Sequence, residues 1–175
     1  TSFTAQGANG GPYFTDRWYV YSGGTSAGRF TATQEAITDL AGFTSAIKLD
    51  CTTADTSIGA DEQLSLVQSI EAQNLQSLGF GTSGAQPLVY SFYAKANANK
   101  TYVAELYKSD TTTSSQSHTF AVTTSWQRFE IPFNNTNANS IGTIVNDNGV
   151  GFYCLIHLHA GSNLTSGTIN STWLA

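Results

Sequence analysis

The sequence has few charged residues, only three prolines and two cysteines, and no methionine. Charged residues make up 11% of the 175 positions, and the formal net charge is −5. Binding to nucleic acid needs clustered Lys and Arg to neutralise phosphates, so no nucleic-acid partner is expected. No apolar run reaches the roughly 18 residues of a membrane-spanning helix, and no signal peptide is present. We therefore expect no membrane insertion.

What the chain does contain favours β-structure. Gly, Ser, Thr, Asn and Ala are abundant, and aromatic residues make up 12% of the sequence. Small, β-branched and aromatic residues with little charge suit sheet proteins that have many loops. The length suits one domain. We expect an arm or loop over residues 1–12 and a single domain over residues 13–175, in a chain that is a fragment of a longer protein.

The clearest pattern runs from Leu88 to Tyr107, where apolar and polar side chains alternate. Leu88, Tyr90 and Phe92 fall on one face of the first run. A short polar bridge, Asn97–Lys100, leads to a second alternating run. A period of two is typical of a half-buried strand, and two such runs joined by about four turn-forming residues predict a β-hairpin.

Similar alternation predicts strands elsewhere in the chain. One of these segments, Glu62–Glu71, also fits a helical stripe, but we favour the strand, followed by a helical turn near Asn74–Leu78. Residues 109–117 and 134–148 are interpreted as loops. The further predicted strands are Tyr13–Tyr21, Arg29–Ala36, Phe43–Cys51, Glu62–Glu71, Thr119–Val122, Trp126–Phe133 and Val150–Leu158. About eight to nine strands without a long helix predict an all-β fold, a jelly-roll β-sandwich of two antiparallel sheets.

The cysteines and histidines give no strong site signal. Cys51 and Cys154 each lie in an alternating apolar run, so two buried free thiols are expected. A disulfide between neighbouring strands is the alternative. His157 and His159 project from one face of a strand, which suits two metal ligands, but no third ligand can be named. We therefore expect no metal site.

Four motifs recur in this order in one group of proteins: FTDRWY (Phe14–Tyr19), QSIE (Gln68–Glu71), LVYSFYAK (Leu88–Lys95) and SWQRF (Ser125–Phe129). Over most of its length the chain resembles the carbohydrate-binding-module-like jelly-roll domains found near the C-termini of bacteriophage tail fibres and related virion proteins. The resemblance implies a non-enzymatic β-sandwich on a virion fibre or spike, often in a homotrimer with other virion proteins as partners. It also implies contact with the host surface, directly or through the part that the domain supports.

Two further expectations follow from this resemblance. The final strand usual in the group is short or missing after Trp173, so a natural neighbour of this segment or another subunit would complete the second sheet. Structural Ca²⁺ occurs in many carbohydrate-binding jelly rolls, but no contiguous calcium loop is present, so no cofactor is expected. The aspartates that would supply oxygen ligands to such an ion are Asp16, Asp50, Asp55, Asp61 and Asp147.

Sugar recognition needs flat aromatic faces for the apolar side of a pyranose ring, with amides and carboxylates for its hydroxyls. The candidate ligand-binding residues are Tyr19, Tyr21, Gln68, Glu71 and Tyr93, provided that they share one sheet face. The alternative is that these tyrosines pack on a second face or at a subunit interface. Trp18 and Trp126 are expected to be structural.

No catalytic residue is predicted. Glu62, Glu71, Glu105 and Glu130 are scattered in the sequence, and no Gly-x-Ser-x-Gly elbow with a matched Ser, His and Asp set stands out. Together with the resemblance, this implies a non-enzymatic domain of a virion appendage that contributes to attachment to host-surface glycans. The alternatives are a head-decoration or fibre-scaffold domain that binds no sugar, and a carbohydrate-binding module of a secreted glycosidase.

Overall fold

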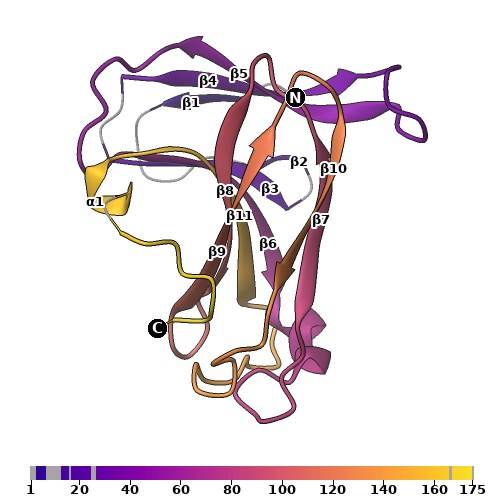
Figure 1. Cartoon of the computed structure of the whole chain (residues 1–175), viewed down its shortest axis with the longest axis vertical. Helices are drawn as coiled ribbons and strands as arrows, with labels where there is room; N and C mark the ends of the chain where they lie inside the picture. The colour runs from indigo at the N-terminus through magenta and orange to yellow at the C-terminus, as the bar shows by residue number, and fades with distance from the viewer. Residues whose placement is uncertain (1–2, 7–12, 16, 25–26, 166, 175) are drawn as a thin grey trace. The chain divides into compact units, whose positions relative to one another are not determined.

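The computed structural model describes residues 3–6, 13–15, 17–24, 27–165 and 167–174. These residues form an all-β fold with two short helical pieces, η1 (Ala72–Leu78) and α1 (Ser162–Thr165) (Figure 1). The strands are β1 (Phe3–Gln6), β2 (Tyr13–Thr15), β3 (Trp18–Gly23), β4 (Arg29–Ala36), β5 (Ser45–Thr53), β6 (Gln63–Glu71), β7 (Leu88–Ala94), β8 (Lys100–Lys108), β9 (Ser114–Val122), β10 (Gln127–Phe133) and β11 (Val150–Ala160). The predicted all-β class is confirmed, with more strands than the eight or nine expected.

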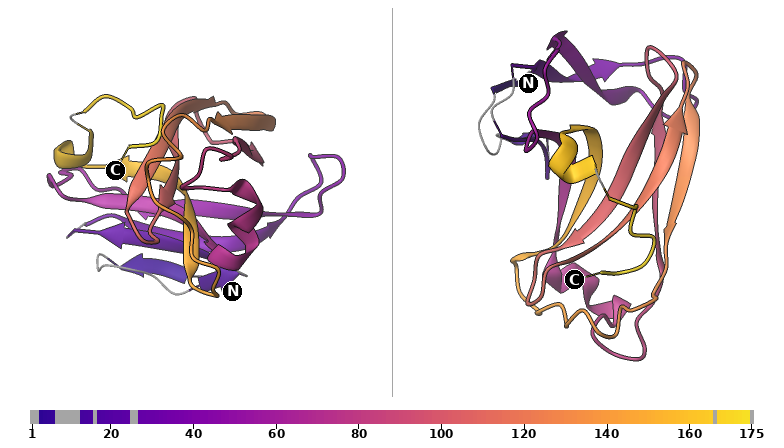
Figure 2. Two further views of the ribbon diagram at one scale, coloured as in Figure 1. Left: turned by 90° about the horizontal axis from the view of Figure 1, so that it is seen from below. Right: turned by 60° about the vertical axis from the view of Figure 1, so that its left-hand side comes forward.

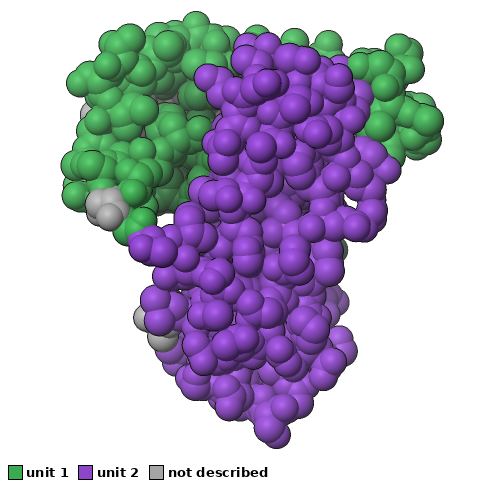
Figure 3. Space-filling view, viewed as in Figure 1, with its two compact units in different colours: residues 1–67, 157–167 green, residues 68–156, 168–175 purple. Residues whose placement is uncertain are grey.

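The strands form three sheets, in the orders β1-β4-β5, β10-β7 and β2-β3-β6-β11-β8-β9. The pairings β1–β4, β4–β5, β2–β3, β8–β9 and β7–β10 are antiparallel. The chain divides into two compact units (Figure 3). The first comprises residues 1–67 and 157–167, and the second comprises residues 68–156 and 168–175. Strands β6 and β11 each pass from one unit into the other.

In the first unit, two expectations are wrong. Residues 3–6 of the expected arm form β1, which pairs with β4 through backbone hydrogen bonds that need no apolar side-chain pattern. The predicted strand Tyr13–Tyr21 is interrupted, because Arg17 has a positive φ of 60° and β2 turns back onto β3. Residues 7–12 lie outside the described part of the chain.

In the second unit, the predicted hairpin is wrong although its faces are right. Strand β7 pairs with β10, whereas β8 pairs with β9. Residues 95–99 therefore connect two different sheets, and the two layers can be followed in Figure 2. Leu88, Tyr90 and Phe92 on β7 pack against the buried core that includes Ala104 and Leu106 of β8. Alternation predicts which face is buried, but it carries no information about which strand is the neighbour.

The core of the second unit fills the space between these layers with aromatic side chains. The rings of Phe92 and Phe120 lie 5.2 Å apart between centroids, and those of Phe120 and Phe129 lie 5.0 Å apart. Phe129, Ile131 and Phe133 point inward from β10, as predicted. Pro132 alternates with them and lies on an edge strand, where proline is tolerated in a sheet.

Trp173 is buried deep in this core, with only 1% of its surface exposed. Its ring stacks on Phe152 at 5.6 Å between centroids and meets Phe80 edge-on at 5.0 Å. The indole N–H donates to the carbonyl oxygen of Asn134 at 2.9 Å. This tryptophan therefore anchors the last described residues, which the sequence pattern had suggested only as an extended stretch.

The segment Asn170–Leu174, here called the C-terminal strap, lies along the edge of β9 (Figure 1). The backbone N–H of Ser117 donates to the carbonyl of Asn170 at 2.8 Å, and that of Ser115 donates to the carbonyl of Leu174 at 2.9 Å. On its other side, the Trp173 N–H donates to the carbonyl of Thr136, just after β10. The strap thus joins the edge strands of the two layers.

Strand β9 begins at Ser114, after five residues of the loop expected at 109–117. Its inward-facing positions carry Ser114, Gln116 and His118 in place of apolar residues. For this reason the alternation of apolar and polar side chains did not predict this part of the strand. Gln116 is fully buried and donates through its amide nitrogen to the strap carbonyl of Ser171 at 2.7 Å. The remaining predicted elements are confirmed: β4, β5 with shifted ends, β6, η1, β10 and β11, and the loop over residues 134–148.

Replacing Trp173 with Ala should destabilise the fold by about 3–5 kcal/mol, because it leaves a cavity between Phe80 and Phe152. Trp126→Ala is the control: Trp126 is half-buried and holds the Lys95 ammonium 4.9 Å from its ring centroid, so its loss should cost about 1 kcal/mol. Urea unfolding of both variants measures the difference. Equal losses in the free energy of unfolding for the two variants would contradict the anchoring role of Trp173.

Stability should also fall as the pH drops below 6.5. Burial lowers the pKa of His118 below its ordinary value of 6.5, and its Nε2 is buried without a partner. A depressed folded-state pKa contributes stability that is present above pH 6.5 and is lost as the pH falls through the lower folded value. The urea concentration at the unfolding midpoint should fall less steeply between pH 7 and pH 5 in the His118→Gln variant than in the native protein. An identical pH dependence in the two proteins would show that His118 does not couple stability to pH.

Candidate functional site

Two tyrosines of the second unit lie side by side on the outward face of the six-stranded sheet. Tyr107 on β8 alternates with the buried Leu106, and Tyr153 on β11 alternates with the buried Phe152. Their ring centroids are 6.2 Å apart and their planes are inclined by 34°. Because β11 and β8 are neighbours in the sheet, the regular backbone of two paired strands holds this pair in place.

Polar groups border the tyrosine pair on the side of β9. The strand register places Ser115 opposite Tyr107 and Ser117 opposite Glu105, all on the outward face. The C-terminal strap follows beyond β9 and contributes Asn170. We call this surface the tyrosine platform; it consists of Tyr107, Tyr153, Glu105, Ser115, Ser117 and Asn170.

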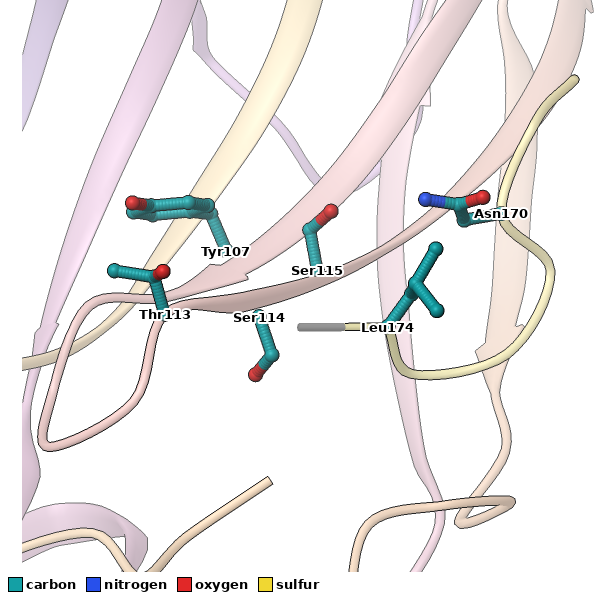
Figure 4. Close-up of a pocket in the computed structure, with 6 residues that line it drawn as sticks. All are labelled: Tyr107, Thr113, Ser114, Ser115, Asn170 and Leu174. Carbon is teal, nitrogen blue, oxygen red and sulfur yellow. The ribbon is translucent and has the colours of Figure 1, made fainter. Parts of the chain in front are cut away.

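A shallow pocket of about 180 Å³ lies at the edge of the platform (Figure 4). It is lined by Tyr107, Thr113, Ser114, Ser115, Asn170 and Leu174. Figure 4 shows that Ser114 and Ser115 point to opposite sides of β9, so Ser115 is the serine that shares its side with Tyr107. Pockets for drug-sized ligands usually have about 300–1,000 Å³. The smaller volume here suits a surface that receives one end or one ring of a ligand.

The platform combines flat aromatic faces with hydroxyl, amide and carboxylate groups. Tyrosine rings can cover an apolar ring face, and their phenol groups still donate and accept hydrogen bonds. The hydroxyls of Ser115 and Ser117, the amide of Asn170 and the carboxylate of Glu105 offer donors and acceptors within the same surface. This set of groups can bind a polyol ring without any enclosed cleft.

The five residues predicted from the sequence lie elsewhere. Tyr19 and Tyr21 are half-buried on one face of β3 in the first unit, and the Tyr19 ring meets that of Tyr13 edge-on at 5.1 Å. Tyr21 packs over the backbone at Gly23, where a Cβ atom would come within 3.2 Å of its ring. These contacts show packing within β2 and β3.

Gln68, Glu71 and Tyr93 belong to the second unit and do not share a sheet face. Gln68 and Glu71 lie on β6, and their odd spacing directs them to opposite faces of that strand. The Glu71 carboxylate accepts a hydrogen bond from the Gln73 amide at 2.8 Å. Tyr93 is 39% exposed on β7, in the other sheet. These three residues therefore do not form a single recognition surface.

Sequence reasoning missed Tyr107 and Tyr153, although the signal was partly there. Both tyrosines occupy the outward positions of strands whose inward faces were predicted correctly. The pairing of β8 with β11 could not be predicted from the sequence. More than forty residues of chain, roughly the span from Lys108 to Val150, separate these two strands.

Residues considered for metal binding are engaged in other contacts. The Nδ1 of His157 lies 2.9 Å from the Ser65 hydroxyl, and the His159 ring packs beside Phe30 at 6.3 Å. Asp55 accepts the backbone N–H groups of Ala27 and Ser57, Asp61 accepts the side chain of Asn163, and Asp147 accepts the N–H of Gly149. Within the described ranges, no three His, Cys, Asp or Glu side chains gather as a metal site. Asp16 lies outside those ranges.

Comparisons with protein-family models, curated proteins and solved structures found no significant match. In the described part of the chain, no helix is long and apolar enough to cross a membrane. The resemblance to virion domains therefore rests on the sequence motifs alone.

The two cysteines are free, and only one of them is buried as predicted. Cys154 points into the core, whereas Cys51 is exposed on β5. The disulfide alternative is excluded, and the expected burial of Cys51 is wrong because β5 exposes several residues of both alternating faces.

Burial raises the pKa of the Cys154 thiol to about 12, so this thiol should not react at neutral pH in the folded protein. A thiol reagent such as DTNB should therefore label one cysteine, Cys51, and label both after denaturation. The Cys51→Ser variant should show no fast reaction. Two fast-reacting thiols in the native protein would contradict this arrangement.

Proposed function

We propose that the chain is a non-enzymatic glycan-binding domain and that its recognition surface is the tyrosine platform. The observation that carries the proposal is the Tyr107–Tyr153 pair, with ring centroids 6.2 Å apart, beside the polar groups of β9 and the strap. The order of the four sequence motifs supports a location on a virion appendage, where such a domain would contribute to attachment to host-surface glycans. Assembly as a homotrimer is part of the same proposal.

The platform favours sugars over flat hydrophobic ligands because aromatic and polar groups alternate within a short distance. A pyranose ring presents apolar C–H groups on its face and hydroxyls around its rim, so it uses both kinds of group at once. The two rings are tilted by 34°, which allows them to contact successive rings of a curved chain. A sheet surface is also pre-organised, which lowers the ordering cost of binding.

Binding without turnover is supported by the carboxylates of the second unit. Glycoside hydrolysis needs two carboxyl groups on opposite sides of the scissile bond. Glu105 is the single carboxylate among the platform residues as defined. Asp110 accepts the backbone N–H of Val145, and Glu130 forms an ion pair with Arg128. These carboxylates have structural partners, which fits a binding domain better than a hydrolase.

A scaffold role without sugar binding is the second candidate function. On the outward face of the β7–β10 sheet, Val89 is 59% exposed and Tyr93 is 39% exposed. Exposed apolar side chains on a two-stranded sheet favour burial against another protein surface. In this case Tyr93, and not Tyr107, would determine assembly.

Replacing Tyr107 or Tyr153 with Ala should weaken glycan binding about tenfold or more, because each ring contributes stacking area and a hydroxyl. A glycan array first identifies bound sugars, and calorimetric titration then measures the affinity of each variant. Tyr93→Ala is the matched control, since it removes an outward tyrosine from the other sheet and should leave affinity unchanged.

Three results would decide between the two candidates. Loss of binding in the Tyr107 and Tyr153 variants, with unchanged oligomeric state, supports recognition by the platform. Loss of assembly in Tyr93→Ala, with no glycan bound by the native protein, supports the scaffold role. Glycan binding that survives both platform substitutions overturns the proposed site.

A further inference from the structure

We infer that the tyrosine platform binds the non-reducing end of a glycan, with the terminal sugar unit in the shallow pocket and the next units over Tyr107 and Tyr153. This inference rests on the proposed function and specifies which part of a glycan is recognised. It follows from one row of side chains across the sheet, which carries the two aromatic rings and ends at an exposed leucine of the C-terminal strap.

The row runs across four adjacent segments, β11, β8, β9 and the strap, and consists of Tyr153, Tyr107, Ser115 and Leu174. The Tyr107 ring lies 6.2 Å from that of Tyr153 between centroids, and Tyr107 pairs with Ser115 in the strand register. The Ser115 N–H donates to the carbonyl of Leu174 at 2.9 Å, and the Leu174 N–H donates back at 3.1 Å. Adjacent strands lie about 4.8 Å apart, so the row spans roughly 14 Å along the backbone. A ligand that contacts both rings and the pocket therefore lies across the strands.

The side chain of Leu174 closes this row. Residues directly opposite each other in an antiparallel pair point to the same face, with Cβ atoms about 5 Å apart, so Leu174 stands beside Ser115. Figure 4 shows Leu174 on the side of Ser115 that faces away from Tyr107. Leu174 is 53% exposed and lines the pocket together with Tyr107. A glycan that continued beyond the pocket along the row would have to pass over this side chain, whereas a glycan that ends in the pocket meets no such obstacle.

The polar groups that line the pocket are available to a ligand. In the part of the chain that the structure describes, the hydroxyls of Thr113 and Ser115 and the side-chain amide of Asn170 make no hydrogen bond. By contrast, Asn134 and Asn135, which follow β10, donate their amides to backbone carbonyls at 2.8 Å. A terminal sugar unit carries one more hydroxyl group than an internal unit of the same sugar, because no further unit is linked there. The unpaired groups of the pocket can bind this additional hydroxyl.

The size of the pocket and the attachment of surface glycans indicate which end is bound. The pocket has about 180 Å³, below the roughly 300–1,000 Å³ of sites for drug-sized ligands, so it suits one sugar ring. A glycan on a cell surface is attached through its reducing end, which leaves the non-reducing end free. The terminal unit that reaches the pocket is therefore the non-reducing one.

The test uses a glycan array whose members are attached through their reducing ends, probed with the full chain. The bound glycans should share their non-reducing terminal unit. Adding one further sugar to that end should lower the affinity about tenfold or more, although the interior of the glycan is unchanged. Calorimetric titration with the free oligosaccharide and with its capped counterpart measures this ratio of affinities, here called the end preference.

Two substitutions test the role of the pocket. Leu174→Ala shortens the side chain that closes the row and should reduce the end preference to about threefold, because the capped glycan gains affinity. Val89→Ala is its matched control, since Val89 is 59% exposed on the other sheet, and it should leave the end preference unchanged. Asn170→Ala should weaken binding of the uncapped glycan about fivefold, because a hydrogen bond to the terminal unit is lost. Thermal unfolding of each variant confirms that it is folded before binding is compared.

The outcomes separate this inference from the proposed function. An end preference that shrinks in Leu174→Ala but not in Val89→Ala, with weaker binding in Asn170→Ala, supports the inference. Bound glycans that share an internal segment and differ at their ends, with binding weakened by Tyr107→Ala, overturn end recognition and leave the platform as the site. An end preference that neither Leu174→Ala nor Asn170→Ala changes also overturns the inference, because the terminal unit then binds outside the pocket. Failure of the full chain to bind any glycan overturns both the inference and the proposed function.

Discussion

The burial of Trp173 is the contact on which the second unit and its candidate site both depend. Its ring stacks on Phe152 and closes the core between the two layers. The same residue fixes the C-terminal strap, because its backbone and indole N–H groups donate to the segment that follows β10. The strap in turn holds Asn170 beside β9. One aromatic side chain thus links core packing to the position of the strap at the candidate surface.

The strap also changes how the edge of the fold should be understood. The resemblance implied a final strand that was short or missing after Trp173, to be completed by a natural neighbour or by another subunit. Instead, Leu174 makes an isolated bridge to Ser115, and Asn170 accepts the N–H of Ser117. These few bonds cover part of the β9 edge within the chain itself. An edge covered in this way is less available for pairing with another chain.

The sequence was sufficient to predict the fold class and most strand positions, because side-chain alternation directly reflects burial. It was insufficient where the structure depends on pairing between strands that are far apart in the sequence, or on a single backbone dihedral angle. Leu88–Tyr107 looked like a hairpin, yet β7 and β8 belong to different sheets. The positive φ of Arg17 divided a strand whose pattern was continuous. The candidate site was wrong for the first reason. Tyr107 and Tyr153 become neighbours only because β8 pairs with β11, whereas Gln68 and Tyr93 lie in different sheets because β7 pairs with β10.

The central claim is that sugars bind on the outward face of β11, β8 and β9, and its most direct test is to map that contact residue by residue. A ¹H–¹⁵N NMR titration of the full chain with an oligosaccharide identified on a glycan array would do this. Shift changes clustered at residues 103–107, 115–117, 153–155 and 170–174 are the predicted result. Changes concentrated on Tyr93 and the rest of the β7–β10 sheet, with the platform unaffected, would contradict the account.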